Sequence, residues 1–181
     1  VNDYFEQNLT PELRAQAHHS TEGYSRQFSQ KLATDNLLFP HWPVEYGGRE
    51  RDAFDMAAMT AVLESLNWEH VTAPITNQVA QALMHFASKE VKYEVLTRFA
   101  RGDALACMGF TEPSCGCDVF AATTRGTLQD DGQWLINGEK IFTSAAHLAD
   151  YCFVLARTDL ELPKHAGLSV FLVPMDLPGI E

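Results

Sequence analysis

The first 105 residues carry apolar side chains at the spacing of α-helices. The clearest apolar stripe advances in steps of three and four residues through Met56, Met59, Val62, Leu63 and Leu66. This pattern predicts a helix that buries one face in a core. Similar spacing predicts three further helices, over about 25–36, around Val79, Leu83 and Phe86, and around Val91, Val95 and Phe99.

Capping residues mark several of the expected helix ends. Thr10 followed by Pro11 indicates a helix start, because threonine can cap a helix and proline tolerates its first position. Ser88 is expected to begin a later helix, and Gly102 to end it. The two prolines within 39–43 interrupt the helical pattern between these points.

After residue 105 the pattern changes to the alternation of β-strands. Asp131 and Gly132 form a strong hairpin signal, because this dipeptide accepts the left-handed backbone of a tight turn. A second turn is expected at Asn137 and Gly138. The expected strands cover residues 123–128, 134–136, 151–157 and 168–173.

This change of pattern predicts an α+β protein of two domains. Residues 1–105 are expected to form an all-α helical domain, and residues 106–181 an antiparallel β-barrel or β-sandwich domain. The final residues, DLPGIE, have the composition of a turn, so the β domain is expected to be incomplete.

Composition argues against several classes of protein. The chain has 13 lysines and arginines against 24 aspartates and glutamates, and its net charge of −11 opposes binding to nucleic acid or anionic membrane. No apolar run approaches the roughly 20 residues that span a bilayer, and the N-terminus lacks a signal-peptide pattern. The spacing of the four cysteines fits neither a zinc knuckle nor a disulfide framework, so reduced thiols and a cytoplasmic location are expected.

The stretch GFTEPSCGCD at 109–118 has the composition of a ligand-binding loop. Gly109 and Gly116 allow close approach of the backbone to a ligand, Pro113 stiffens the turn, and Thr111 offers a hydroxyl. The backbone N–H groups of such a loop can bind an anionic or heteroaromatic ligand. A polar turn that only precedes the β domain has the same composition. The loop sequence alone therefore does not distinguish a ligand-binding loop from a structural turn.

Other signatures of catalytic sites are absent from the sequence. There is no Rossmann or Walker glycine pattern and no G-x-S-x-G elbow. Cys107, Cys115 and Cys117 are conceivable nucleophiles, but the sequence places no histidine beside any of them. A cysteine-based redox or metal protein therefore remains a weaker alternative, and no metal site is expected.

Five segments, in order, resemble the acyl-CoA dehydrogenase family. WPVEYGG at 42–48 and the segment at 88–103, which ends in ARGD, are similar to two parts of the family's helical domain. GFTEPSCGCD at 109–118 resembles the first family signature, usually written with T-E-P-G-x-G-S-D. NGEKIFTSAAH at 137–147 and LARTD at 155–159 resemble the second region.

The resemblance implies FAD as cofactor and a three-part architecture, whose C-terminal helical bundle is absent from this chain. It implies that Thr111 bonds the pyrimidine side of the flavin, Phe142 lies against the ring system and Ser144 bonds flavin N5. On a strand, the Phe142 ring and the Ser144 hydroxyl would share one side; a core position for Phe142 is the alternative. The implied cofactor-binding residues are Met108, Gly109, Phe110, Thr111, Cys117, Phe142, Thr143 and Ser144.

The resemblance further implies an FAD-dependent oxidoreductase that dehydrogenates an acyl-CoA thioester at its α and β carbons. In the family, a carboxylate removes the α-proton while a hydride passes from the β carbon to flavin N5. That carboxylate belongs to the C-terminal domain, so the base is expected beyond Glu181 and no catalytic residue is assigned. Glu112 and Asp118 are expected to stabilise the loop instead.

Several positions depart from the family pattern. Cys117 replaces a serine that faces cofactor phosphate and acyl-CoA, so it is the expected substrate contact, with a weaker donor. Ala145, Ala146 and His147 replace an N-G-G-like run. These changes indicate an atypical member and leave two alternatives: a non-catalytic or cofactor-poor partner subunit of a heteromeric dehydrogenase, or a flavin oxidase of the same fold.

The resemblance also implies partners. These are an acyl-CoA substrate from fatty acid or steroid side-chain degradation, electron-transfer flavoprotein as electron acceptor, and further subunits in a homo- or hetero-oligomer. Neither nucleic acid nor a membrane span is expected. The acyl group is not identified by the sequence, because the apolar positions within 56–66 and 83–86 suit a core as well as a pocket wall.

Overall fold

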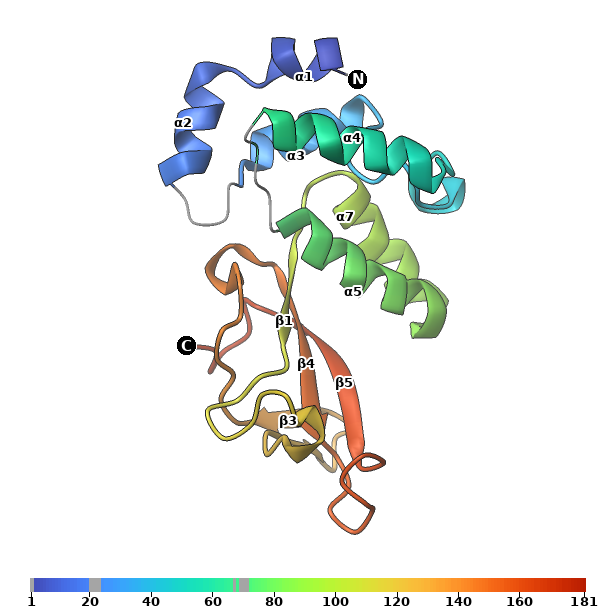
Figure 1. Cartoon of the computed structure of the whole chain (residues 1–181). Helices are drawn as coiled ribbons and strands as arrows, with labels where there is room; N and C mark the ends of the chain where they lie inside the picture. Colours follow the sequence, from blue (N-terminus) through green and yellow to red (C-terminus); the bar gives the residue numbers. More distant parts are fainter. Residues whose placement is uncertain (1, 20–23, 67, 69–71) are drawn as a thin grey trace. The chain divides into compact units, whose positions relative to one another are not determined.

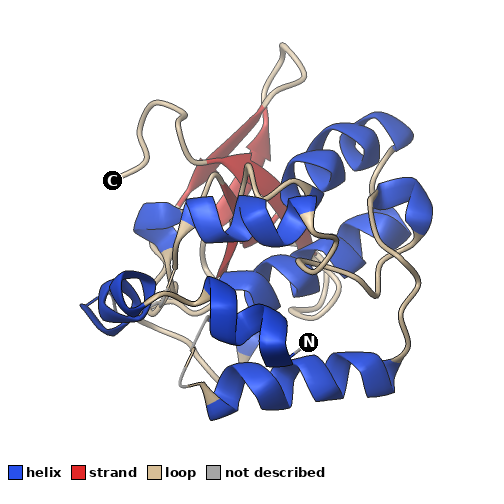
Figure 2. Ribbon diagram, turned by 90° about the horizontal axis from the view of Figure 1, so that it is seen from above, coloured by secondary structure: helices blue, strands red, loops and turns tan. Residues whose placement is uncertain are grey.

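The computed structural model describes residues 2–19, 24–66, 68 and 72–181. The chain divides into two units, Val1–Leu105 and Ala106–Glu181, which are described separately. The named strands all belong to the second unit, and every α-helix belongs to the first (Figures 1 and 2). A helical domain followed by a β domain is the fold that the sequence predicted.

Most helix starts and stops follow the predicted signals. Thr10 Oγ1 accepts a hydrogen bond from Leu13 N at 3.3 Å, and Ser88 Oγ caps its helix through Val91 N at 3.4 Å. Gly102 adopts the left-handed φ of 71° that ends the last helix. The helices are α1 (Asn2–Asn8), α2 (Pro11–His19), α3 (Arg26–Thr34), α4 (Ala53–Ser65), α5 (Thr72–Phe86), α6 (Lys89–Val91) and α7 (Thr97–Ala100).

The core of the helical unit forms where α1, α3 and α4 pack together. The predicted stripe of α4 is confirmed, since Met59 and Leu63 are buried and Met56, Val62 and Leu66 pack against the cluster. Phe86 differs from its neighbours on α5, because its side chain is 89% exposed. The buried members of the cluster are Phe5, Leu9, Phe28, Leu32, Met59, Leu63 and Trp68.

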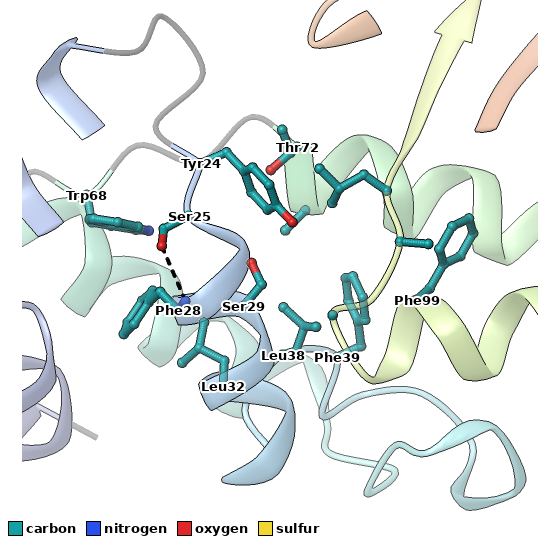
Figure 3. A pocket seen from close by; sticks show the side chains of 14 residues that line it. Tyr24, Ser25, Phe28, Ser29, Leu32, Leu38, Phe39, Trp68, Thr72 and Phe99 are labelled. Carbon is teal, nitrogen blue, oxygen red and sulfur yellow. Dashed lines mark hydrogen bonds between the residues drawn. The ribbon is translucent and has the colours of Figure 1, made fainter. Parts of the chain in front are cut away.

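A small cavity lies inside this unit (Figure 3). Its walls include Phe28, Phe39 and Phe99, and Ser25 Oγ accepts a hydrogen bond from Phe28 N at its edge. Its volume is about 20 Å³, which is room for about one water molecule. The cavity is therefore a packing defect and not a ligand site.

The proline-rich segment after α3 folds around a buried tryptophan. Trp42 is fully buried, and its ring stacks on Phe39 with centroids 4.2 Å apart. Trp42 Nε1 donates to Asn77 Oδ1 at 2.7 Å, and His41 Nε2 donates to the same oxygen at 2.9 Å. Asn77 on α5 thus connects the proline-containing segment 39–43 to the helical core.

The predicted helix around Val91, Val95 and Phe99 contains a π-helical turn, η2 (Lys92–Leu96), between α6 and α7. Val95 and Phe99 are both buried, so the expected face is inward. A π turn adds a residue to the local repeat. The π turn lies between α6 and α7, and the buried residues Val95 and Phe99 lie within it and after it.

The second unit is a five-stranded sheet around β4. In Figure 1, β1 and β5 flank β4 on opposite sides, in agreement with the pairing. β2 pairs with β3 and meets the end of β4 at Arg125 and Arg157. The strands are β1 (Ala106–Gly109), β2 (Arg125–Leu128), β3 (Trp134–Asn137), β4 (Tyr151–Arg157) and β5 (Leu168–Pro174).

The sheet is mixed, which corrects the expectation of wholly antiparallel pairing. β4 runs parallel to β1 and antiparallel to β5. The reason is the long connection between β1 and β4, which contains the β2–β3 hairpin and allows the chain to return in the same direction. The described strands form an open sheet and do not close into a barrel.

The predicted hairpin at Asp131 and Gly132 is confirmed. Gly132 has a φ of 82°, and Asp131 Oδ1 accepts a hydrogen bond from Gln133 N at 2.9 Å.

The short helical turns of this unit are η3 (Val119–Ala121) and η4 (Ala146–Leu148), and η1 (Val44–Tyr46) belongs to the helical unit. Among the described residues, no helix combines the length and the hydropathy needed to cross a membrane.

Replacing Asn77 by leucine is expected to lower the free energy of unfolding by about 1–3 kcal/mol, because the buried Trp42 N–H loses its acceptor. Equilibrium urea denaturation of the intact protein measures the change. Gln81→Leu is the matched control on the same helix, since Gln81 makes only a 3.4 Å contact with Asn77 Oδ1. Equal losses in the two variants would contradict a special role for Asn77.

Candidate functional site

Two loops of the β unit lie side by side. The 109–118 loop leaves the end of β1, and the 138–148 segment connects β3 to β4. Ile141 N donates to Thr111 O at 2.9 Å, and Lys140 Nζ donates to Phe110 O at 3.3 Å. The two segments that carry the family-like motifs are therefore joined by one bond between their backbones and one from a side chain to a backbone carbonyl.

Glu112 is the centre of this junction. Its side chain is 2% exposed and forms an ion pair with Lys140 at 2.8 Å between Oε1 and Nζ. Its carboxylate also accepts hydrogen bonds from Thr123 N at 2.7 Å, Thr123 Oγ1 at 2.6 Å and Thr124 N at 2.9 Å. One carboxylate thus fixes three separate stretches of chain.

The same contacts keep Glu112 ionised. Burial by itself would raise the pKa of this carboxyl, but the hydrogen bonds from Lys140, Thr123 and Thr124 outweigh burial and hold the pKa well below its ordinary value. A carboxylate with so low a pKa, fully engaged by donors, is a poor proton acceptor. The expectation that Glu112 has a structural role agrees with this geometry.

Asp118, at the other end of the loop, is also paired. Its Oδ2 lies 2.6 Å from Lys164 Nζ, and both side chains are more than half exposed. The turn between the two acids is closed by reciprocal backbone hydrogen bonds between Glu112 and Cys115 at 2.9 and 3.1 Å. Neither acidic group of the loop therefore carries an unpaired charge.

Phe142 does not lie on a strand, which corrects the argument made from its spacing to Ser144. Its φ is 55°, a left-handed conformation that is uncommon for an aromatic residue, and its side chain is 88% exposed. The core alternative for Phe142 is therefore wrong as well. A non-glycine residue held in the left-handed region is often found at a functional position, and the exposed ring is accessible to a ligand.

The remaining candidate residues lie in or beside the two joined loops. Gly109 is buried, while Met108, Phe110, Thr111 and Thr143 are half-buried. Phe110 stacks against Phe153 with ring centroids 6.1 Å apart. Cys117 and Ser144 are exposed, so their polar atoms are available to a ligand.

Thr143 carries an orphaned hydroxyl. Its Oγ1 is buried and has no hydrogen-bond partner among the described residues. A buried hydroxyl without a partner is costly, and a bound ligand with a polar edge would supply one. Among the candidate residues, Thr143 therefore has a hydroxyl that a bound ligand could satisfy.

Sequence reasoning missed Lys140, Thr123 and Thr124. Lys140 is 11% exposed as a side chain, which is unusual for a lysine unless it is paired. Its place within NGEKIF gave no local signal of this role, because its partner Glu112 lies 28 residues away along the chain. No local pattern could identify Thr123 or Thr124 as donors, because both belong to the approach to β2.

Replacing Glu112 by glutamine is expected to lower the free energy of unfolding at neutral pH by about 3–5 kcal/mol, because Lys140 is left buried without a counter-charge. The folded pKa of Glu112 lies below its unfolded value of about 4.5. The carboxylate therefore stabilises the fold fully above that pH, and this stabilisation decreases as the pH falls below it. Urea denaturation between about pH 6 and pH 3 should give a steeper loss for the unsubstituted protein than for the variant.

Asp118→Asn is the control, because it removes an ion pair that is exposed on both sides. The expected change is only about 0–1 kcal/mol. If the two substitutions cost the same, or if Glu112→Gln retains the acid sensitivity, the buried pair does not stabilise the loops.

Comparison with known proteins identifies this arrangement. Residues 1–103 match the family described as "Acyl-CoA dehydrogenase, N-terminal domain", and residues 107–181 match "Acyl-CoA dehydrogenase, middle domain". The acyl-CoA dehydrogenase IpdE1 of Mycobacterium tuberculosis is 37% identical over 86% of this chain and 40% of its own length. The chain thus spans less than half the length of this relative.

Solved structures give the same result. A Tcur3481-Tcur3483 steroid ACAD matches 98% of this chain and 46% of its own, with a TM-score of 0.88 and 33% identity. The ChsE4-ChsE5 complex of Mycobacterium tuberculosis matches 97% of this chain and 44% of its own, with a TM-score of 0.84 and 32% identity. A glutaryl-CoA dehydrogenase of Mycobacterium smegmatis in complex with FADH2 matches 98% and 44%, with a TM-score of 0.81 and 27% identity. With both of its units matched, the chain belongs to the acyl-CoA dehydrogenase family.

Proposed function

We propose that this chain is the acyl-CoA-binding and flavin-binding part of an FAD-dependent acyl-CoA dehydrogenase. The reaction is the α,β-dehydrogenation of an acyl-CoA thioester. The observation that carries the proposal is the pair of joined loops, 109–118 and 138–148, in a chain of this family. Relatives named as acyl-CoA dehydrogenases, and one solved with FADH2, support the same chemistry.

The residues of the joined loops fit a flavin. The exposed Phe142 ring offers an apolar face, and the orphaned Thr143 hydroxyl requires a polar partner. The paired states of Glu112 and Asp118 remove free negative charge that would repel a phosphate-bearing cofactor. When bound, FAD supplies the acceptor for a hydride.

Each candidate residue has a proposed task. Phe142 covers the ring system, and the hydroxyls of Thr111 and Ser144 hydrogen-bond its polar edge. Cys117 contacts the cofactor phosphate and the acyl-CoA, with a weaker donor than a hydroxyl. Backbone groups of Met108, Gly109 and Phe110, with Thr143, complete the proposed cofactor-binding set.

The α-proton of the substrate needs a base that these residues do not provide. Glu112 is fully engaged by its donors, and Asp118 is paired with Lys164. We assign the base to a carboxylate outside residues 1–181. The role of this chain is then to position cofactor and thioester, which is a large part of the catalytic task in a flavoenzyme.

The helical unit offers a surface for the acyl group. An apolar hollow of about 600 Å³ opens between α4 and α5, with Met56, Met59 and Ile75 among its lining residues. His41 also lines it, and its Nδ1 is buried without a hydrogen-bond partner among the described residues. A hollow of this size suits a bulky acyl group, such as one derived from a steroid side chain, as well as a fatty acyl chain.

One proposed partner follows from the relatives and the other from the family resemblance. The name of the ChsE4-ChsE5 complex describes an assembly of two different chains, which supports a heteromeric enzyme here. Electron-transfer flavoprotein is the proposed acceptor of the electrons that leave the flavin.

The first test is the visible absorption spectrum of the intact protein, before and after anaerobic addition of acyl-CoA esters with fatty and steroid-derived acyl groups. A flavin spectrum that bleaches with one class of ester is expected, because the bound cofactor accepts the hydride. Bound flavin that no ester bleaches would favour an inert partner subunit, and rapid reaction of reduced flavin with oxygen would favour an oxidase. Failure to bind FAD on reconstitution would contradict the proposal.

Replacing Phe142 by alanine is expected to weaken FAD binding about 10- to 100-fold, the equivalent of burying one phenylalanine ring against the cofactor. Flavin fluorescence on dilution of the holoprotein measures the dissociation constant. Phe86→Ala is the matched control, since Phe86 is exposed to the same extent but belongs to α5. Unchanged FAD affinity in the Phe142 variant would remove this residue from the cofactor site.

A further inference from the structure

Two buried thiols face each other across neighbouring strands. Cys107 on β1 is directly paired with Cys152 on β4, and both are free thiols. The two strands are parallel, so side chains at paired positions share one face of the sheet. The strand spacing of about 4.8 Å falls within the Cα separation of about 4.4–6.8 Å that a disulfide spans.

The two thiols differ in access. Cys107 is fully buried, whereas Cys152 retains 7% exposure. Cys152 also lines a hollow of about 550 Å³ in the β unit, together with Ile136, Lys140 and Val173. A small solute that enters this hollow therefore meets Cys152 first.

The two thiols also differ in acidity. The interaction with Cys107 lowers the pKa of Cys152 against the effect of burial, and the Gly109 N–H and the positive charge of Lys140 act in the same direction. The same interaction, together with burial, raises the pKa of Cys107. Cys152 lines the hollow whereas Cys107 is fully buried, so Cys152 is assigned as the nucleophile and Cys107 as the second thiol. The lowered pKa of Cys152 agrees with this assignment, because the thiolate is the reactive form. Lys140 is itself paired with Glu112, and Glu181 also lines the hollow.

We propose that Cys107 and Cys152 form a site of covalent modification, a buried dithiol that a peroxide oxidises to an intramolecular disulfide. Cys152 Sγ attacks one oxygen of hydrogen peroxide, the O–O bond breaks, and a sulfenic acid and water result. Cys107 Sγ then attacks the Cys152 sulfur. The S–O bond breaks, the S–S bond forms, and a second water leaves with the Cys107 proton. The two thiols lose two electrons and the peroxide gains them.

The disulfide would act on the start of the 109–118 loop. A Cβ atom placed on Gly109 would lie 3.0 Å from Cys152 Sγ and 3.2 Å from Lys140 Cγ, so the backbone of Gly109 packs against both side chains. Movement of Sγ toward Cys107, to a bond of about 2.05 Å, changes this contact. The alternative is that both cysteines are inert and act as small apolar core residues.

The test uses the intact protein as isolated, carrying Cys115→Ser and Cys117→Ser so that only the pair remains among the four cysteines of residues 1–181. After treatment with hydrogen peroxide, the protein is denatured, alkylated with iodoacetamide and analysed by mass spectrometry. The expected product has lost about 2 Da, has lost two alkylation sites, and yields a peptide that links Cys107 to Cys152. In the same background, Cys107→Ser should give a Cys152 sulfenic acid that dimedone traps, and Cys152→Ser should give neither product.

The exposed Cys117 of the unsubstituted protein calibrates the peroxide dose. If Cys107 and Cys152 both remain open to alkylation at a dose that oxidises Cys117, the pair is inert and the proposal is overturned. Oxidation of Cys152 to a sulfinic acid without a linked peptide overturns it equally. The linked peptide is sought in the protein that keeps both Cys107 and Cys152. The proposal is therefore tested even if the Cys107→Ser or the Cys152→Ser variant fails to fold.

Discussion

The arrangement of the β unit depends on the buried ion pair between Glu112 and Lys140. Both side chains are nearly removed from solvent, and a buried charge is tolerated only when its partners remain in place. If either side chain moves away, the other is left as a buried charge without a counter-charge. The pair therefore restricts both loops to one arrangement. The donors Thr123 and Thr124 extend this constraint to the approach of β2.

This constraint explains how the glycine-containing 109–118 loop can form part of a defined site. The 109–118 loop contains glycines and polar residues that have no packing of their own. The salt bridge and the Ile141–Thr111 backbone bond hold it against the 138–148 segment. Groups that bind a ligand are most effective when neighbouring contacts have already fixed their positions. The exposed residues of the two loops can therefore act together although they are far apart in the chain.

The elements that could be predicted are those whose patterns are local. The strands at 151–157 and 168–173 were both predicted, the second of them from its nearly continuous apolar character, and β4 and β5 match them almost residue for residue. β1 was missed because it has only four residues and its partner lies far along the chain. The site motif was found through resemblance, but the role of Lys140 was not, because its partner Glu112 is distant in sequence.

The error at Phe142 has the same physical origin. The argument from the sequence placed Phe142 and Ser144 on one side of a strand, because residues two apart on a strand share a face. In the folded chain, Lys140 pairs with Glu112, Ile141 N donates to Thr111 O, and the next residue, Phe142, has a left-handed φ of 55°. The ring of Phe142 is exposed to solvent.

Lys140 connects the two chemistries assigned to this unit. Its ammonium group neutralises Glu112, and its side-chain carbons lie against Gly109, close to Cys152 Sγ. The adjacent Cys107 thiol and the positive charge of Lys140 both lower the pKa of Cys152. Oxidation of the pair would then change the packing around Gly109 without breaking the ion pair. The loop could respond to a disulfide while Glu112 and Lys140 keep it folded.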